Sequence, residues 1–337
     1  MMLSFSLLED DRLIVRAPAA LLPFAQHWLP LHRRAMYGAG PVGAATITLS
    51  ESADVALPNL NGHPVLLRLG PVSARTVDAD TIVFHGTGAS GRILLADLSA
   101  TISVSTEEDA DPAAAVYSML TLSAALLLGR LGAALVHAGG IVDPTGGAWL
   151  FAGDTHAGKT TTCVSLADAG WRFLADDQVV LREVEGAIVS EGWPRLAHLD
   201  AGYDRREITD QRIAADVGER WSRHAANGTV RTAAVHAVVL PAVEAERRTS
   251  VRRVSPADAL SVIVRQSPWL LADRVVAPRV LALLQATSLR PAYALTLGRD
   301  SYGNGALLGA LLGALGNVQG VCSGAVQQDA CSIGPPA

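Results

Sequence analysis

The sequence predicts an α/β protein with a mixed sheet, in which an α/β core follows a strand-rich N-terminal region. Short runs of alternating or β-branched residues, broken by Gly, Pro, Asn and Asp, fill the chain up to about Thr106. Beyond residue 130, strand patterns alternate with helical ones, and a glycine-rich loop separates one strand from one helix. The 337 residues, half of them apolar and 18% charged, are enough to bury a large core.

The N-terminal region, residues 1–110, is predicted to consist mostly of antiparallel strands. Its strand-like runs are short and are bounded by turn residues. A helix is predicted over residues 112–129, because the acidic residues at 107–111 suit a helix N-terminus. We expect strands at residues 13–16, 45–49, 65–69, 81–85 and 92–96.

The predicted core domain, residues 111–320, changes to longer strands and helices. Its central part reads as a strand, a tight turn, a second buried strand, the glycine-rich loop and a helix. Gly170 stands where a glycine commonly follows the end of a helix. These elements are expected at residues 134–142 (strand), 143–147 (turn), 148–152 (strand), 159–169 (helix) and 171–175 (strand).

Further elements complete the core domain. The Gly/Ala/Leu-rich helix expected at residues 305–320 packs on the core and is the candidate interface for a possible homo-oligomer. Residues 321–337, which end in GPPA, are expected to form a flexible tail. The remaining strands are expected at residues 178–182, 235–240 and 292–297, and the remaining helices at 210–226, 256–264 and 273–285.

Composition and charge argue against several classes of protein. The formal net charge of −5 disfavours a nucleic-acid partner, which usually needs a basic field. The N-terminus lacks the pattern of a signal peptide, and three cysteines cannot form a disulfide framework, so we expect a cytoplasmic location. Residues 113–129 are uncharged but number only 17 and run into a strand, so we expect a buried helix and no membrane span.

A phosphate-binding motif follows the second core strand. The octapeptide GDTHAGKT matches the pattern G-x-x-x-x-G-K-[ST]. Its glycines let backbone N–H groups face phosphates, Lys159 reaches the β- and γ-phosphates, and the Thr160 hydroxyl can ligate Mg²⁺. A chance match would not explain the strand before the motif and the capped helix after it. We therefore predict a nucleotide-binding loop formed by Gly153, Asp154, Thr155, His156, Ala157, Gly158, Lys159, Thr160 and Thr161.

Two aspartates, Asp176 and Asp177, end the next predicted strand. In a parallel sheet this strand end lies at the same edge as the loop, so one carboxylate can hold Mg²⁺ while the other faces a hydroxyl as a base. The competing interpretation is a solvent-exposed acidic turn. His137, in the predicted strand upstream, is either a locally bonded core residue or a neighbour of the phosphates.

Together these residues resemble the catalytic domain of the HPr kinase/phosphorylase family, which is grouped with phosphoenolpyruvate carboxykinases rather than with ordinary P-loop NTPases. The resemblance rests on the order of VHAGGIV, GDTHAGKTT, the helix-ending glycine and LADD, over about fifty residues. It implies an HPr kinase-like P-loop core that uses ATP and Mg²⁺. Lys159 and the loop backbone would hold the triphosphate, and Thr160 and Asp177 would bind Mg²⁺. Asp176 would be the catalytic base, and His137 would lie near the transferred phosphate.

The chain also departs from this family. Thr155 and His156 stand where the family usually has Ser and Gly; Thr keeps a hydroxyl, whereas His loses the freedom of Gly. We find no counterpart of the glycine-rich segment that follows an Arg in bifunctional HPr kinases, so phosphorolysis and HPr as substrate are not expected. The chain is more similar to divergent members of peptide natural-product pathways, including the lasso-peptide kinases, which phosphorylate a C-terminal serine of a precursor peptide.

Three functions are compatible with the sequence. The first is a kinase acting on a hydroxyl, such as Ser, of a peptide or protein substrate, for example a lasso-type precursor peptide. The second is the same chemistry on a small molecule, and the third is an ATP-binding sensor or scaffold, against which the intact Lys159, Thr160 and aspartate pair argue. The sequence does not select the arginine that neutralises the transferred phosphate from Arg195, Arg205, Arg206, Arg231 and Arg253.

Overall fold

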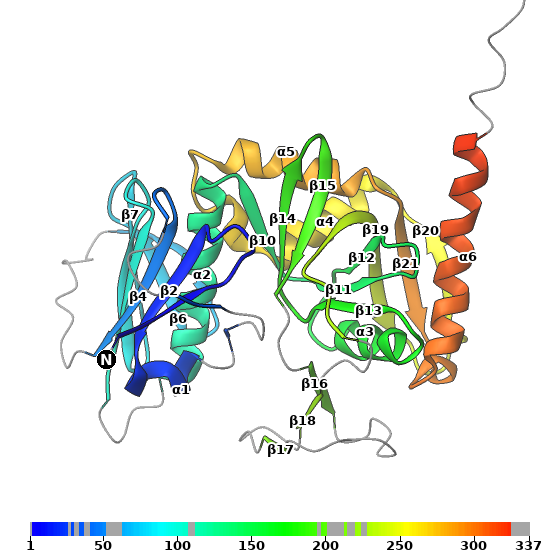
Figure 1. The fold of residues 1–337 in the computed structure, drawn as a ribbon, viewed down its shortest axis with the longest axis horizontal. Helices are drawn as coiled ribbons and strands as arrows, with labels where there is room; N and C mark the ends of the chain where they lie inside the picture. Colours follow the sequence, from blue (N-terminus) through cyan, green and yellow to red (C-terminus); the bar gives the residue numbers. More distant parts are fainter. Residues whose placement is uncertain are drawn as a thin grey trace, which may run out of the picture.

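Two large sheets form the body of the protein (Figure 1). One is built from the N-terminal region and the other from the central and C-terminal parts of the chain, so the fold is mixed α/β, as the sequence predicts. The computed structural model describes residues 2–25, 28–29, 34–36, 41–51, 63–106, 112–193, 197–200, 212–213, 220–223 and 228–324.

The N-terminal sheet has the strand order β3-β1-β2-β4-β9-β8-β7-β6-β5. Most neighbours are antiparallel, as predicted, but β4 runs parallel to both β2 and β9. Two short helices, η1 (Ala19–Leu21) and α1 (Leu22–Ala25), follow β2. The strands are β1 (Met2–Ser6), β2 (Leu13–Pro18), β3 (Arg34–Met36), β4 (Ala45–Glu51), β5 (Val65–Leu69), β6 (Val72–Thr76), β7 (Thr81–Gly86), β8 (Ala89–Leu94) and β9 (Ser99–Val104).

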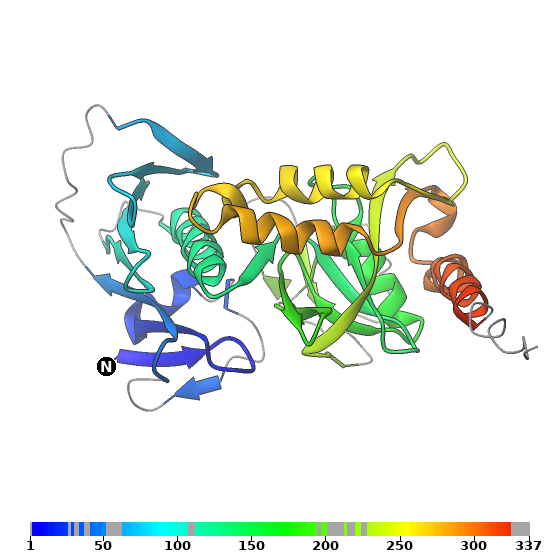
Figure 2. The same ribbon diagram turned by 90° about the horizontal axis from the view of Figure 1, so that it is seen from above.

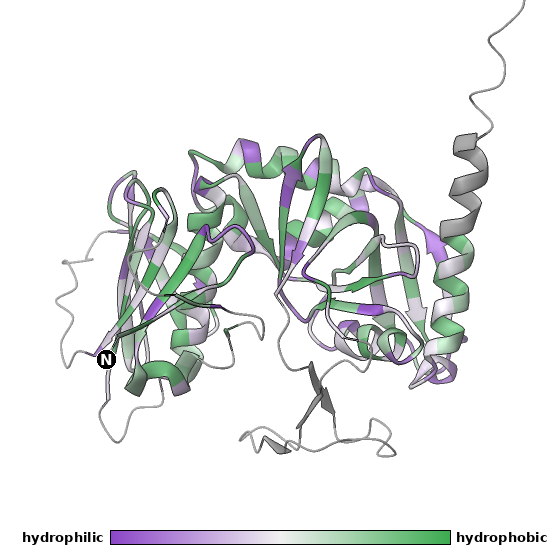
Figure 3. Cartoon of the chain, viewed as in Figure 1, coloured by the Kyte–Doolittle hydropathy of each residue, from purple (hydrophilic) through white to green (hydrophobic). Residues whose placement is uncertain are grey.

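Helix α2 (Ala113–Arg130) joins the two sheets. It packs on β4, β8 and β9 of the N-terminal sheet and on β10 of the second sheet, and it lies between the two in Figure 2. Within the described residues it is the helix long and apolar enough to cross a membrane, yet 78% of that window is buried inside the fold. The predicted buried helix is thus confirmed, and most of its ribbon has the colour of hydrophobic residues in Figure 3.

The second sheet is mixed. Its order is β10-β14-β15-β19-β12-β11-β13, with β21 beside β19 and β20 beside β21. The expected single strand over residues 134–142 is wrong, because the chain changes partners at His137: β10 pairs with β14, whereas β11 pairs with β12 and β13. The strands are β10 (Ala133–Val136), β11 (Gly139–Val142), β12 (Ala148–Phe151), β13 (Arg172–Ala175), β14 (Val179–Val184), β15 (Ala187–Gly192), β19 (Thr232–Val243), β20 (Ser250–Arg253) and β21 (Ala292–Leu297).

Helices cover both faces of the second sheet. Trp149 and Phe151 of β12 pack with α3 and α6, whereas Leu150 belongs to the large core shared with α4 and α5, as the alternation of side chains along a strand requires. Figure 2 shows α4 and α5 side by side along one face. The helices are α3 (Lys159–Asp168), α4 (Pro256–Gln266), α5 (Ala277–Ser288) and α6 (Gly305–Gly324), with the short turns η3 (Pro268–Leu271) and η4 (Arg299–Ser301).

A three-stranded sheet corrects a second prediction. Strands β16 (Ala197–Asp200), β17 (Arg212–Ile213) and β18 (Arg220–Arg223) pair in the order β16-β18-β17. A helix was expected over residues 210–226, since Ala, Gln, Glu and Arg favour helices. In β17 and β18 cross-strand pairing overrides that weak preference, and the rest of the range lies outside the described residues, as do residues 107–111 and 325–337.

Charged residues join the N-terminal sheet to the second sheet. The backbone N–H of Glu9 donates to Glu191 Oε1 at 2.6 Å, and Arg231 lies 3.5 Å from the Glu9 carboxylate. Glu191 is fully buried, with Arg182 at 3.8 Å. Burial raises the pKa of Glu191, although the Glu9 N–H and the Arg182 charge act in the opposite direction. The buried carboxylate therefore opposes folding when it is charged.

We predict that Glu191→Gln stabilises the protein at pH 7.5, by about 1 kcal/mol, the ordinary size of a single-substitution effect. The folded-state pKa of Glu191 lies above its ordinary value of 4.5. The contribution of Glu191 to stability is therefore complete below pH 4.5 and is lost as the pH rises through the folded-state pKa. The gain should be seen in urea unfolding at pH 7.5 and should vanish near pH 4. Glu183→Gln, on the exposed side of β14, is the matched control, and an equal gain at both pH values would contradict the explanation.

Candidate functional site

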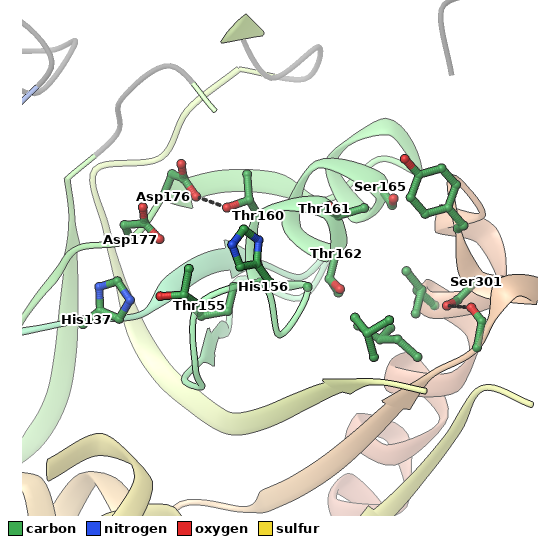
Figure 4. A pocket seen from close by; sticks show the side chains of 17 residues that line it. His137, Thr155, His156, Thr160, Thr161, Thr162, Ser165, Asp176, Asp177 and Ser301 are labelled. Carbon is green, nitrogen blue, oxygen red and sulfur yellow. Dashed lines mark hydrogen bonds between the residues drawn. The ribbon is translucent and has the colours of Figure 1, made fainter. Parts of the chain in front are cut away.

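A cavity of about 400 Å³ lies at the carboxyl ends of β12 and β13. It collects residues that are far apart in the sequence, from His137 to Leu308. Figure 4 shows the side chains around it. The described residues that line it are His137, Thr155, His156, Gly158, Lys159, Thr160, Thr161, Thr162, Ser165, Asp176, Asp177, Val243, Leu297, Gly298, Ser301, Tyr302 and Leu308.

The glycine-rich loop connects β12 to α3 along one wall of this cavity. Gly158 precedes the helix in a left-handed conformation, with φ +95°, and a Cβ there would meet Leu297 Cδ1 at 2.6 Å. The left-handed conformation favours glycine, and a Cβ would also push the Leu297 side chain aside. Lys159 begins α3, is only 5% exposed, and donates from Nζ to the carbonyls of Gly153 (3.0 Å) and Asp154 (3.1 Å). The loop thus holds a buried ammonium group beside the positive end of a helix, an arrangement suited to phosphates.

The two aspartates lie beside the loop, and the sheet explains why. β11 is antiparallel to both β12 and β13, so these two strands run in the same direction and end at the same edge. The two strands run parallel to each other, as the sequence argument assumed, but they are not neighbours, because the antiparallel β11 stands between them. Thr160 Oγ1 donates to Asp176 Oδ1 at 2.7 Å. Two segments predicted separately from the sequence meet in this hydrogen bond.

Backbone hydrogen bonds hold the two aspartates in place. Asp176 is 2% exposed, and Asp177 adopts a left-handed conformation with φ +62°. The carbonyl of Asp176 accepts from the Gln178 N–H at 2.8 Å, and that of Asp177 accepts from the Ala138 N–H at 3.1 Å. The second bond ties the aspartate turn to the segment between β10 and β11.

His137 lies in that same segment, outside the strands, and lines the cavity. Its backbone N–H donates to Ser267 Oγ at 2.8 Å, at the start of η3. Figure 4 places its ring near the aspartate end of the cavity. Its position between two differently paired strands brings it to the site, which a continuous strand would not explain.

The oxygen atoms of Thr160 and Asp176 fit a magnesium ion. Mg²⁺ prefers hard oxygen ligands and commonly uses one or two carboxylates together with the phosphates of its substrate. A hydroxyl and a carboxylate oxygen 2.7 Å apart meet that requirement. Among the described residues, no group of three or more His, Cys, Asp and Glu side chains could hold a metal ion alone.

The cysteine of α3 has no place in this chemistry. Cys163 is completely buried beneath the loop, 3.1 Å from the position that a Cβ on Gly139 would take. Burial raises the pKa of its thiol well above the ordinary value, and the charge of Asp176 acts in the same direction. A protonated, enclosed thiol is neither a nucleophile nor a metal ligand.

The five candidate arginines are not among the described residues that line the cavity. Arg231 pairs with Glu9 at the junction of the two sheets, and Arg253 ends β20. The predictions for Arg195, Arg205 and Arg206 lie outside the residues whose side chains the structure describes.

Sequence reasoning missed two features of the site. Val243, Leu297, Ser301 and Tyr302 also line the cavity, and no spacing in the sequence connects them to the loop. Figure 4 shows Ser301 at the end away from the aspartates. The outer side of the loop faces a second cavity of about 570 Å³. There the Asp154 carboxylate accepts a hydrogen bond from Gln266 and lies 3.6 Å from Arg265; both residues belong to the last turn of α4. The side chain of Asp154 therefore points away from the aspartate pair.

Comparison with known proteins finds a distant structural likeness and no match by sequence. No model of a protein family matches the chain, and no curated protein matches it. The structure is similar to that of the Hpr(Ser) kinase/phosphatase from Coxiella burnetii, with 12% sequence identity and a TM-score of 0.33, over 58% of this chain and 98% of that one. At these values the likeness by itself assigns neither an activity nor a residue.

We predict that Gly158→Ala destabilises the protein. The alanine would pay about 1 to 2 kcal/mol for the left-handed conformation and would also displace Leu297. Gly170→Ala is the matched control, since Gly170 has φ +101° but no atom within 4 Å of the added Cβ. Denaturant unfolding should show a larger loss for Gly158→Ala. Equal losses would mean that the contact with Leu297 is unimportant.

Proposed function

We propose that this protein is an ATP-dependent kinase that transfers the γ-phosphate to a hydroxyl group. The observation that carries the proposal is the hydrogen bond between Thr160 and Asp176, beside Asp177 and Lys159 in one cavity. A phosphate-holding loop, oxygen ligands for Mg²⁺ and a carboxylate for the hydroxyl proton are the components that phosphoryl transfer needs. A loop alone would support binding without transfer.

The arrangement of side chains along the cavity suggests how a nucleotide would lie in it. Figure 4 shows His137 and the aspartates at one end and Ser301 at the other, with the start of α3 between them. The triphosphate would lie on the loop and along Thr160 and Thr161. The adenine ring would lie against apolar and aromatic side chains of the cavity, among them Leu297 and the half-exposed Tyr302.

Magnesium would be held by Thr160 Oγ1 and one aspartate, together with phosphate oxygens. When bound, it would neutralise the charge of the phosphates. Lys159 would contribute a second positive charge from the loop. Its ammonium group is already held inside the loop, by hydrogen bonds to the carbonyls of Gly153 and Asp154.

The two aspartates would divide the remaining work. The resemblance described above gives the base to Asp176 and the metal to Asp177. The hydrogen bond from Thr160 favours the opposite division, because the carboxylate beside the metal-binding hydroxyl is the one best placed to share its metal. Asp177 is also less buried than Asp176, which suits a group that meets an incoming substrate. We therefore prefer Asp177 as the base and Asp176 on the metal side.

In the reaction, the acceptor hydroxyl oxygen would attack the γ-phosphorus while the bond to the β-γ bridging oxygen breaks. ADP would leave, and the hydroxyl proton would pass to the aspartate base. His137 would lie beside the transferred phosphate, on the side away from the adenosine end. We place the reaction in the cytoplasm, where ATP is available.

We propose a serine hydroxyl of a peptide or protein as the acceptor, on the resemblance to peptide-modifying kinases. A precursor of a ribosomal natural product, such as a lasso peptide, is the first candidate. The alternatives are a small-molecule hydroxyl and an ATP-binding protein without turnover. Incubation of the wild-type protein with Mg-ATP and with each acceptor class, followed by mass spectrometry and by measurement of ADP, separates the three.

We predict that Asp177→Asn and Asp176→Asn each lower the rate of phosphate transfer by roughly 10²- to 10⁴-fold, the range expected when a proton acceptor or metal ligand is lost. The variant that has lost the metal ligand should recover part of its rate at high Mg²⁺ concentration, and the variant that has lost the base should not. Steady-state kinetics with a magnesium titration gives the answer. Our preferred division predicts recovery for Asp176→Asn.

Asp168→Asn, at the exposed C-terminal end of α3, is the matched control and should keep the wild-type rate. If both active-site variants transfer phosphate normally, the kinase proposal fails. If the wild-type protein binds ATP but phosphorylates no acceptor and releases no ADP, the sensor or scaffold interpretation replaces it.

We predict that Tyr302→Ala raises the KM for ATP about tenfold, because stacking of a base on an aromatic ring contributes roughly 1 to 3 kcal/mol. Tyr302→Phe should retain the wild-type value, since it keeps the ring. Binding of tripolyphosphate, which has no base, should be the same in all three proteins when measured by calorimetry. A parallel loss of tripolyphosphate affinity would show that Tyr302 supports the loop instead.

A further inference from the structure

His156 is the residue of the site that the proposed function leaves unexplained. It lies inside the phosphate loop with φ +64°, in the left-handed region. Glycine adopts this conformation without cost, whereas any other residue pays for it, His less than a bulky one. His156 thus carries a side chain at a position whose backbone conformation favours glycine. An observed backbone outlier of this kind is a reason to look for a function.

Packing does not account for the side chain. His156 is exposed, and within the described residues its ring makes no hydrogen bond or ion pair. It lines both cavities, the one with the aspartates and the one outside the loop. Hydrogen bonds and ion pairs within the described residues thus give no reason for the ring, whereas its place on both cavities makes a ligand the candidate partner.

The surroundings indicate which ligand. Figure 4 shows the imidazole directed into the same cavity as Thr160, Asp176 and Asp177. On this side the charged and titratable neighbours are those aspartates, Lys159 and His137; on the outer side they are Asp154, Arg252, Asp258 and Arg265.

The cavity offers little positive charge to a triphosphate, and an imidazole can add a donor. A triphosphate brings several negative charges to a wall that already holds two aspartates. Among the described residues that line the cavity, Lys159 is the side chain with a permanent positive charge. An imidazole N–H is a hydrogen-bond donor, and in the imidazolium form it gives the shorter and stronger bond of a charged donor to phosphate.

We propose that His156 contacts the terminal phosphates of the nucleotide and acts as a catalytic residue of the transfer. One ring N–H donates to a β- or γ-phosphate oxygen and stabilises the charge that develops as the bond to the leaving ADP breaks. This inference rests on the proposed function. It gives the loop a side-chain donor in addition to its backbone N–H groups.

His156→Gly tests the proposal, because glycine fits φ +64° and the variant should fold at least as well as the wild type. The expected result is a fall of about 100-fold in kcat/KM for phosphate transfer, with partial recovery when imidazole is added. His156→Asn tolerates the left-handed region and keeps an N–H donor, so it should retain more activity than His156→Gly. Wild-type kinetics for His156→Gly would overturn the proposal.

Glu185→Gly is the matched control for the backbone. Glu185 has φ +52° in the exposed turn between β14 and β15, outside the cavity. It should gain a similar amount of stability and keep the wild-type rate. If it loses activity as His156→Gly does, the effect comes from the altered backbone and the proposal fails.

A binding measurement separates this inference from the kinase proposal. Tripolyphosphate should bind His156→Gly about tenfold more weakly than it binds the wild type, whether or not an acceptor has been found. In proton NMR, the imidazole signal that is absent from His156→Gly should shift in the wild type when tripolyphosphate is added. If tripolyphosphate binds both proteins equally and leaves that signal in place, His156 does not contact phosphate. If the binding results hold while no acceptor is phosphorylated, only the kinase proposal fails.

Discussion

The antiparallel strand β11 is the constraint on which the site depends. By pairing with β12 on one side and β13 on the other, it makes these two strands run in the same direction. The phosphate loop leaves β12 and the aspartates leave β13 at one edge. The hydrogen bond of 2.7 Å between Thr160 and Asp176 then joins them. A shift of one residue in either pairing would turn the side chains to the opposite face and separate the two halves of the site.

Side chains of the N-terminal region and of α2 are connected by hydrogen bonds to this edge of the second sheet. Gln178, directly after the aspartates, is 2% exposed and donates to Thr121 Oγ1 of α2 at 3.0 Å. Trp28 of the N-terminal region donates to the same oxygen at 3.0 Å and accepts from Trp193 at its carbonyl. The aspartate turn is therefore held by a polar contact that the second sheet cannot supply alone, and α2 connects the two regions mechanically as well as through its apolar surface.

The sequence predicts the local parts of this structure well. The loop, the helix that follows it and Gly170 depend on neighbouring residues, and their bounds differ by one residue at most; β21 is predicted at its observed bounds. The predictions that fail are those that depend on which strands pair with one another. The break at His137, the parallel pairing of β4 and the strand Arg220–Arg223 are set by residues distant in the chain. The same holds for Tyr302, which reaches the cavity only because β21 lies beside β19.

Backbone conformation carries a final piece of information about the site. In the described part of the chain, five residues other than glycine have a positive φ; Asp177 and His156 line the cavity, and the other three do not. Such conformations cost free energy and persist only where the surroundings fix them. The Ala138 N–H donates to the carbonyl of Asp177 and so holds that residue in place. Two strained residues thus line the cavity in which we propose that phosphate binds, so a ligand would meet polar groups whose backbone is already in place.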